Sequence, residues 1–340
     1  MSRKAFKGRE EHIGHDRVLA SLYRAAEDDA LHHAYLLEGP EGVGKRQIAD
    51  LMALTVNCTE DRAEKRPCGR CNTCRTIRDG THPDVLVLEP DPTKASASIP
   101  VDAVREVIRQ AGYHRYGARR RVVIVDPAEA MAEPAANALL KTLEEPPEGT
   151  GFFLVTHNAQ ALLPTIRSRC QRVRLGAVPT SAITRWLSGR KVDDAEVLAQ
   201  LALGCPGRAL ALSGKGLTAR AALRSQLFDV LNGPIDDVFG FSQRLCKGGR
   251  ADYGPKVDAL LSLVEDLLRD VVVVGAGGDA GLLNADASDD VKAMARRLYP
   301  DGVTRCTEAI QDARDQLSVY VSGRLVVDSL ICRVRQALGR

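Results

Sequence analysis

A glycine-rich segment near the start of the chain has the residue types of a phosphate-binding loop. Residues 39–46 read GPEGVGKR, and they follow an apolar stretch and precede a helical pattern. In such loops the backbone N–H groups surround phosphate, a lysine contacts the terminal phosphates, and a hydroxyl residue after the lysine holds Mg²⁺. Here Arg46 stands at the hydroxyl position. The residues that we expect to bind a nucleotide phosphate are Gly39, Gly42, Gly44 and Lys45.

ATP hydrolysis by a protein of this type also requires an acidic site, in which an aspartate at the end of an apolar strand holds Mg²⁺. Asp126 follows the apolar residues 122–125 and has that position. The next residue is Pro127 and not a water-activating glutamate, and Glu129 comes later. These departures, together with Arg46, argue against efficient hydrolysis. The helix N-terminus can still attract the phosphates of ATP or ADP, so the sequence leaves nucleotide binding open.

Four of the nine cysteines are grouped with a spacing typical of a metal site. Their pattern is C-x9-C-x2-C-x2-C, formed by Cys58, Cys68, Cys71 and Cys74. Four thiolates at this spacing predict a closed tetrahedral Zn²⁺ site with a structural role. The alternative is a loop with ordinary reduced thiols. The other five cysteines are scattered through apolar or helical stretches, where cysteine is typically a small buried residue.

An arginine in the sequence Ser168-Arg169-Cys170 precedes a predicted strand and could contact another chain. An arginine supplied by a neighbouring subunit stabilises the charge that develops during phosphoryl transfer. Taken alone, Arg169 would be read as a solvated charge. The basic cluster 119–121 also reads as part of a solvated loop, with phosphate contact to DNA as the alternative.

The elements that must position these residues alternate between strand and helix over the first half of the chain. Apolar runs at 34–38, 84–88, 122–125, 152–156 and 172–175 predict five strands, with helices between them. This alternation predicts an α/β fold with a parallel sheet that helices cover on both faces. After Pro179 the remaining patterns are helical.

We therefore expect three domains in this chain of 340 residues. A P-loop domain spans 1–178 and contains the cysteine insertion at 58–80, a three-helix unit spans 179–213, and a helical domain spans 217–340, with a hinge at 213–216. The apolar stripe along 257–271 reads either as internal core or as a surface for a partner. The glycine- and aspartate-rich residues 275–290 read as a loop.

The composition excludes several classes of protein. Lys plus Arg exceed Asp plus Glu by 47 to 44, a formal net charge of +3 that gives no bulk argument for nucleic-acid binding. Residues 1–7 lack the apolar core of a secretory signal, and no apolar run is long enough for a membrane span. We expect a cytoplasmic protein without membrane contact.

Several longer strings make the chain resemble bacterial clamp-loader subunits of the AAA+ superfamily. They are HAYL at 33–36, the cysteine segment 58–74, HPD at 82–84, AANALLKTLEEPP at 135–147, SRC at 168–170 and PGRA at 206–209. The resemblance implies an AAA+ RecA-like sheet domain with a zinc-binding insertion, a small helical lid and a C-terminal helical collar. It implies Arg169 as an arginine finger toward the next subunit. It also places Thr156 at the sensor-one position and Arg208 at the sensor-two position of a nucleotide site.

Within that superfamily the departures at Arg46 and Pro127 favour the delta-prime family. The gamma/tau motor family keeps a hydroxyl residue after the lysine and an acidic pair after the strand. The resemblance implies a role in loading the sliding clamp onto primed DNA, in a hetero-pentameric ring with gamma/tau and delta subunits. A self-sufficient motor ATPase using Lys45, Asp126 and Glu129 is the main alternative. A zinc-dependent DNA-binding protein is a third reading, which the small net charge disfavours.

Overall fold

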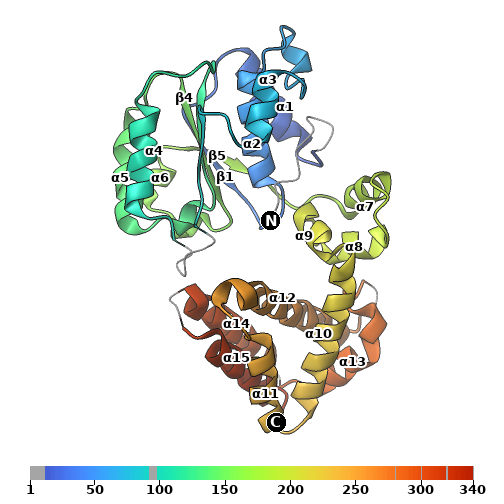
Figure 1. Ribbon diagram of the computed structural model, residues 1–340. Coiled ribbons are helices and arrows are strands. Elements are labelled where there is room, and N and C mark those ends of the chain that lie inside the picture. Colours follow the sequence, from blue (N-terminus) through green and yellow to red (C-terminus); the bar gives the residue numbers. More distant parts are fainter. Residues whose placement is uncertain (1–11, 92–97, 280, 300, 319–320, 340) are drawn as a thin grey trace. The chain divides into compact units, whose positions relative to one another are not determined.

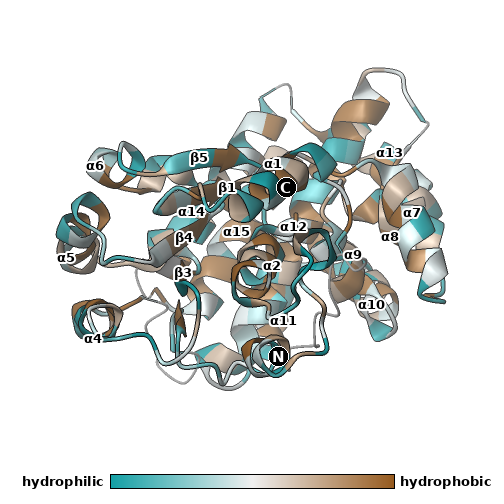
Figure 2. Cartoon of the chain, turned by 90° about the horizontal axis from the view of Figure 1, so that it is seen from above, coloured by the Kyte–Doolittle hydropathy of each residue, from teal (hydrophilic) through white to brown (hydrophobic). Residues whose placement is uncertain are grey.

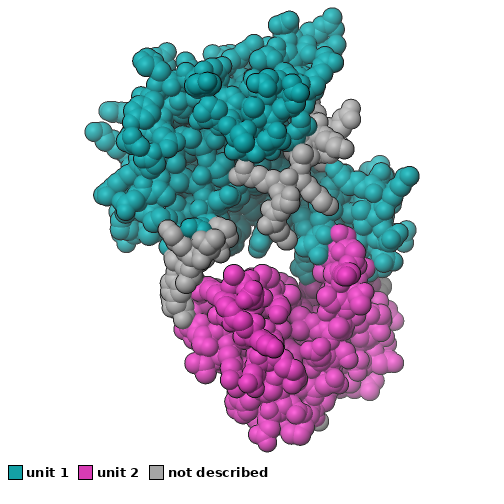
Figure 3. All heavy atoms as spheres, viewed as in Figure 1, with its two compact units in different colours: residues 1–91, 97–211 teal, residues 92–96, 212–340 magenta. Residues whose placement is uncertain are grey.

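The computed structural model describes residues 12–91, 98–279, 281–299, 301–318 and 321–339 (Figure 1). The predicted absence of a signal in residues 1–7 lies outside these ranges. The chain divides into two compact units, which Figure 3 colours separately: residues 1–91 with 97–211, and residues 92–96 with 212–340. The first unit contains both the predicted P-loop domain and the predicted three-helix lid. That finer division stays a prediction.

Within the described residues of the first unit, five parallel strands form one sheet in the order β2-β3-β4-β1-β5. The strands are β1 (Ala34–Glu38), β2 (Val85–Leu88), β3 (Arg121–Val125), β4 (Thr150–Thr156) and β5 (Gln171–Arg174). Every residue of β1, β3 and β4 is buried, which explains their continuous apolar runs. The predicted α/β class is confirmed.

Helices cover both faces of this sheet (Figure 1). The helices before β5 are α1 (Asp16–Glu27), α2 (Lys45–Asn57), α3 (Asn72–Arg78), α4 (Val101–Ala111), α5 (Glu133–Glu144) and α6 (Pro164–Arg167). After β5 the chain forms α7 (Thr180–Gly189), α8 (Ala195–Leu201) and α9 (Pro206–Leu212). Alternate strand residues face opposite sides. Tyr35 and Leu37 therefore join a core with α1 and α2, whereas Ala34 and Leu36 join a core with α4 and α5. Figure 2 shows hydrophobic and hydrophilic residues along both α4 and α5, as expected for helices with one buried face.

Because the strands are parallel, the sheet has two chemically different edges, which we call the carboxyl edge and the amino edge. Glu38, the last residue of β1, pairs with Thr156 and Arg174, so residues 39–44 lie at the carboxyl edge. Asp126 follows β3 at the same edge. At the other end, α2 returns to the amino edge, where the Arg120 N–H donates to Asn57 Oδ1 at 3.0 Å.

The basic cluster 119–121 is not simply a solvated loop, so that reading was wrong for one member. Arg121 is 4% exposed and forms an ion pair of 2.7 Å with Asp84, which is fully buried. The Asp84 carboxylate also accepts N–H bonds from residues 116, 117 and 118. These bonds and Arg121 hold the pKa of Asp84 low against the opposing effect of burial, which is the largest single influence. Asp84 and Arg121 therefore fix the loop before β3.

The second unit is helical in the residues described. Its helices are α10 (Lys215–Asn232), α11 (Asp236–Leu245), α12 (Arg250–Gly275), α13 (Ser288–Arg297), α14 (Gly302–Ser318) and α15 (Gly323–Ala337). The predicted hinge is wrong in part because α10 begins at Lys215, and the predicted loop 275–290 is too long because α13 begins at Ser288. The apolar stripe of α12 belongs to the internal core, since Val257, Leu260 and Val264 are at most 2% exposed.

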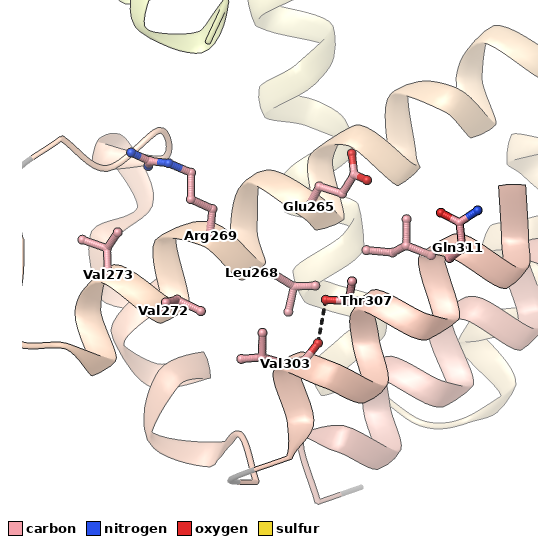
Figure 4. A pocket seen from close by; sticks show the side chains of 9 residues that line it. Glu265, Leu268, Arg269, Val272, Val273, Val303, Thr307 and Gln311 are labelled. Carbon is pink, nitrogen blue, oxygen red and sulfur yellow. Dashed lines mark hydrogen bonds between the residues drawn. The ribbon is translucent and has the colours of Figure 1, made fainter. Parts of the chain in front are cut away.

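A groove of about 340 Å³ lies between α12 and α14 in the second unit (Figure 4). Leu268 and Val272 line it from α12, while Val303 and Thr307 line it from α14. Thr307 donates a hydrogen bond of 2.8 Å to the Val303 carbonyl within the same helix. The groove contributes no residue to the site described below. None of the described helices combines the length and apolar composition needed for a membrane crossing.

Candidate functional site

Glycine is required at two positions of the phosphate loop by close approach of neighbouring backbone. At Gly39, φ is +154°, and a Cβ atom would lie 2.2 Å from the Leu175 carbonyl oxygen. Gly42 has φ of +76°, and its carbonyl accepts a 2.8 Å hydrogen bond from the Gly207 N–H at the start of α9. A Cβ on Gly207 would lie 2.9 Å from Gly42 Cα. The loop is thus held between the end of the sheet and α9.

Lys45 is held at this loop by the loop's own carbonyl groups. It is 7% exposed, and its Nζ donates to the carbonyls of Gly39 at 2.7 Å and Pro40 at 2.8 Å. An ammonium group has three donors, so this arrangement leaves a further donor for a phosphate. Burial lowers the pKa of Lys45, and the carboxylates of Glu129 and Asp126 oppose that effect.

Arg46, near the start of α2, forms an ion pair with Asp126, which follows β3. Its Nη1 lies 3.1 Å from Asp126 Oδ2 and 3.4 Å from Glu89, and its Nε lies 3.1 Å from Asp50 Oδ1. Burial lowers the pKa of Arg46, but Asp50 and Asp126 outweigh it, so the net shift is upward. Burial raises the pKa of Asp126, opposed by Arg46. The aspartate predicted to hold a metal is therefore paired with the arginine of the same site.

Glu129 lies in the same site, although it does not directly follow Asp126 in the sequence. Its Oε1 is 2.5 Å from Nδ1 of His157 and accepts the His157 backbone N–H at 3.0 Å. Burial would raise the pKa of Glu129, but hydrogen bonds from His157 and Thr156 outweigh it and lower the pKa to about 2. Its Oε2 is buried without a hydrogen-bond partner among the described residues. A carboxylate held ionised in this way is a weak base at neutral pH.

The remaining predicted residues of the nucleotide site occupy the same edge of the sheet. Thr156, the last residue of β4, is fully buried, and its Oγ1 accepts the Asn158 N–H at 3.0 Å. Arg208 follows Gly207 in α9, and its backbone N lies 3.1 Å from the position of a Cβ on Gly42. The structure thus brings the predicted loop, acidic and sensor residues together. Their binding of nucleotide stays a prediction.

The four grouped cysteines converge after α2. The Sγ atoms of Cys58, Cys68, Cys71 and Cys74 all lie within 4.8 Å of one another. Backbone N–H groups of Cys68, Cys71 and Cys74 donate to the sulfur of the preceding cysteine in the series at 3.2–3.3 Å. Such bonds stabilise thiolate ligands. The cluster can hold a metal ion, and the all-sulfur donor set with tetrahedral spacing fits Zn²⁺.

Arg169 lies at the amino edge of the sheet, just before β5. Its Nη1 donates to the Thr165 carbonyl at 2.9 Å, and its Nη2 forms an ion pair with Glu144 at the end of α5. The side chain is 33% exposed. The start of β5 pairs with Tyr35, near the start of β1, whereas the phosphate loop follows the end of β1. Arg169 and this chain's own loop therefore lie at opposite edges.

The central residues of the site were predictable from the sequence, but the residues that they pair with were not. Neither the Arg46–Asp126 pair nor the Glu129–His157 pair was predicted, and for His157 the sequence left open only a phosphate contact with DNA. The sequence did contain one indication of the second pair, because Glu129 comes three positions after Asp126, the aspartate at the end of β3. The contact between Glu144 and Arg169 joins the string AANALLKTLEEPP at 135–147 to the string SRC at 168–170.

The sheet order, the loop after β1, the acidic residue after β3 and the helical second unit define an AAA+ type of P-loop protein. Residues 14–179 match the family model described as DNA polymerase III, delta subunit. The chain is 32% identical to the DNA polymerase III subunit delta' of Escherichia coli over 314 residues, covering 90% of each protein. The chain belongs to the DNA polymerase III delta' subunit family.

Two further relatives match a smaller share of their own length. The delta' subunit of Pseudomonas aeruginosa is 41% identical over 194 residues, which cover 56% of this chain and 58% of that protein. The gamma/tau subunit of Mycobacterium tuberculosis is 30% identical over 359 residues, covering 95% of this chain and 60% of that protein. The chain thus spans nearly the full length of the Escherichia coli delta' subunit but only part of the gamma/tau protein.

Proposed function

We propose that this chain is a clamp-loader subunit that does not hydrolyse ATP itself and supplies Arg169 to the ATP site of a neighbouring gamma/tau-type subunit. Together with gamma/tau and delta subunits it forms a hetero-pentameric ring that loads the sliding clamp onto primed DNA in the cytoplasm. Its contacts with clamp and DNA are made through that complex.

The observation that carries this proposal is the position of Arg169. It lies at the amino edge, while the phosphate loop of the same chain lies at the carboxyl edge. A partly exposed arginine with this placement cannot serve its own loop and is suited to another chain. Glu144 and Thr165 orient its guanidinium, which limits the entropy lost when it meets a phosphate.

The contacts of the charged residues at the carboxyl edge support the proposal that this chain does not hydrolyse ATP. Arg46 contacts Asp126, the residue on which a metal would depend. Glu129 is engaged by His157, and its low pKa makes it a poor acceptor for a proton from water. These contacts argue against the alternative of a gamma/tau-type motor that hydrolyses ATP with Lys45, Asp126 and Glu129.

The cofactor that we propose is one structural Zn²⁺ held by Cys58, Cys68, Cys71 and Cys74. A closed set of four protein ligands leaves no position for a substrate. The ion would tie the end of α2 to α3, since Cys58 follows α2 and Cys74 lies within α3.

The test is DNA-stimulated ATP hydrolysis by a reconstituted clamp loader that contains Arg169→Ala. An arginine finger contributes a factor on the order of 10³ at the site it serves, so the complex should lose that site's share of phosphate release. Arg167→Ala is the matched control, because Arg167 is the last residue of α6, two positions before Arg169, and its Nη1 donates to Gln160. Wild-type hydrolysis by the Arg169→Ala complex would contradict the proposal.

A further inference from the structure

Arg46, in the first turn of α2, contacts the aspartate at the end of β3. In P-loop proteins Mg²⁺ is held by the hydroxyl residue after the lysine and by an aspartate at the end of a neighbouring strand. Here Arg46 replaces the hydroxyl residue, and its Nη1 lies 3.1 Å from Asp126 Oδ2. One ligand of Mg²⁺ is absent from its expected position and the other is paired with a cation. Mg²⁺ therefore does not fit this site.

The guanidinium of Arg46 is fixed in that place by more than one contact. Asp50, one turn further along α2, binds its Nε at 3.1 Å, and Glu89 after β2 lies 3.4 Å from its Nη1. The Arg46 side chain is 23% exposed. An arginine stays charged throughout the accessible pH range. A charged guanidinium, paired through its Nε and Nη1 with carboxylates, is thus fixed on the side of the loop where a metal would neutralise phosphate.

The parts of the loop that bind phosphate directly are retained. Lys45 is buried at the loop with its Nζ held by two carbonyls, and the N-terminus of the 13-residue helix α2 follows Gly44. A guanidinium is itself a strong partner for phosphate oxygens, which it can bind with two N–H groups at once. Removing Mg²⁺ from such a loop would therefore leave its affinity for phosphate largely intact.

We propose that Arg46 takes the place of the divalent cation, so that this loop binds a nucleoside di- or triphosphate without Mg²⁺. Lys45 and the N-terminus of α2 bind the phosphates from one side, and Arg46 provides the positive charge on the other. The proposal concerns the chain's own loop and does not depend on the role of Arg169 in a neighbouring site.

The experiment is a calorimetric titration of the isolated full-length chain with ADP, in excess MgCl₂ and again in excess EDTA. We expect the two dissociation constants of the wild type to agree within about twofold. Arg46→Thr restores the hydroxyl residue and frees Asp126, so Mg²⁺ should tighten ADP binding to this variant by about tenfold or more. Lys45→Ala should lose binding in both buffers.

Arg105→Thr is the control for replacing a helical arginine that has a carboxylate neighbour. Arg105 lies on α4 and pairs with Asp102 on its own helix at 3.6 Å, so its removal should leave both dissociation constants unchanged. The proposal fails if Mg²⁺ tightens ADP binding to the wild type by about tenfold, or if the wild type binds no ADP in either buffer.

A second measurement keeps the proposal testable if Arg46→Thr does not fold. Mn²⁺ can be followed by electron paramagnetic resonance in a mixture of wild-type protein and ADP. The protein should bind no Mn²⁺ beyond the amount that ADP alone retains. Formation of a ternary complex of protein, ADP and Mn²⁺ would show that Arg46 does not exclude the metal.

Discussion

Both edges of the sheet contain ion pairs, and the Arg169–Glu144 pair at the amino edge is more exposed than the Arg46–Asp126 pair at the carboxyl edge. At the carboxyl edge, Arg46 contacts Asp126, and His157 contacts Glu129. At the amino edge, Arg169 contacts Glu144, but both side chains are one third to one half exposed. The charges of the nucleotide loop are thus matched within the chain. Arg169 lies where another chain can reach it.

This difference fits the proposal that the chain keeps the form of an ATP site while its Arg169 serves the ATP site of a neighbouring subunit. The loop retains Lys45 and its glycines, of which Gly39 packs closely against Leu175 after β5 and Gly42 against α9. Asp126 is engaged by Arg46, and Glu129 is engaged by His157. Loss of turnover at one edge is therefore compatible with a functional arginine at the opposite edge.

The largest expected effect concerns the cysteine cluster, which follows α2 at the amino edge. Cys71→Ser should abolish zinc binding and destabilise the first unit by more than ~5 kcal/mol, because metal binding contributes directly to folding. Serine retains an oxygen that can cap α3 in place of the Cys71 sulfur, so the variant separates metal binding from capping. Zinc content by mass spectrometry and thermal unfolding are the measurements.

Cys246→Ser is the control for the cysteine variant. Cys246 is half-buried in the second unit and does not belong to the cluster. Its replacement should leave one zinc ion per chain. Unchanged zinc content in Cys71→Ser would show that the four-cysteine assignment is wrong.

A second prediction tests the buried ion pair at the amino edge. Arg121→Ala leaves the Asp84 carboxylate buried without its cation, which should lower the free energy of unfolding by about 3–5 kcal/mol. Denaturant unfolding of the purified variant measures this change. Arg119→Ala, at an exposed position of the same cluster, should change stability by less than ~0.5 kcal/mol. Equal effects of the two variants would contradict the distinction between them.

A smaller effect is expected from the Glu129–His157 pair at the carboxyl edge. The hydrogen bond to Glu129 raises the pKa of His157 above 6.5, so its stabilisation is complete below pH 6.5 and is lost as the pH rises through the higher folded value. The pKa of Glu129 falls from 4.5 to about 2, so its stabilisation is present above pH 4.5 and is lost toward pH 2. The pair should contribute most between these two unfolded values.

The measurement is the melting temperature of the wild type minus that of His157→Ala across this pH range. The difference should be greatest between pH 4.5 and 6.5 and should shrink in alkaline buffer. Because the His157 side chain is 54% exposed, the contribution should not exceed ~1 kcal/mol. The exposed His114 provides a control, since His114→Ala should give a difference without this pH profile.

The sequence predicted the strands, the phosphate loop and the cysteine cluster because each depends on local spacing. The burial of charged residues and the pairing of residues far apart in the sequence could not be predicted in the same way. Arg121 follows two other arginines and reads as solvated, and its burial depends on Asp84, which lies 37 positions earlier. Likewise, the pairing of Arg46 with Asp126 spans 80 positions. Residues 213–216 read as a hinge because of their glycines, although α10 already begins at Lys215.

The most direct test compares Lys45→Ala with Arg169→Ala in the same reconstituted clamp loader. DNA-stimulated ATP hydrolysis is measured after gel filtration has shown that each complex assembles. We predict that the Lys45→Ala complex retains wild-type hydrolysis, because in our proposal this chain's own loop does not hydrolyse ATP. The Arg169→Ala complex should lose the part of the total ATP hydrolysis that the neighbouring subunit's site contributes. Reduced hydrolysis with Lys45→Ala and normal hydrolysis with Arg169→Ala would contradict the assignment of the two edges.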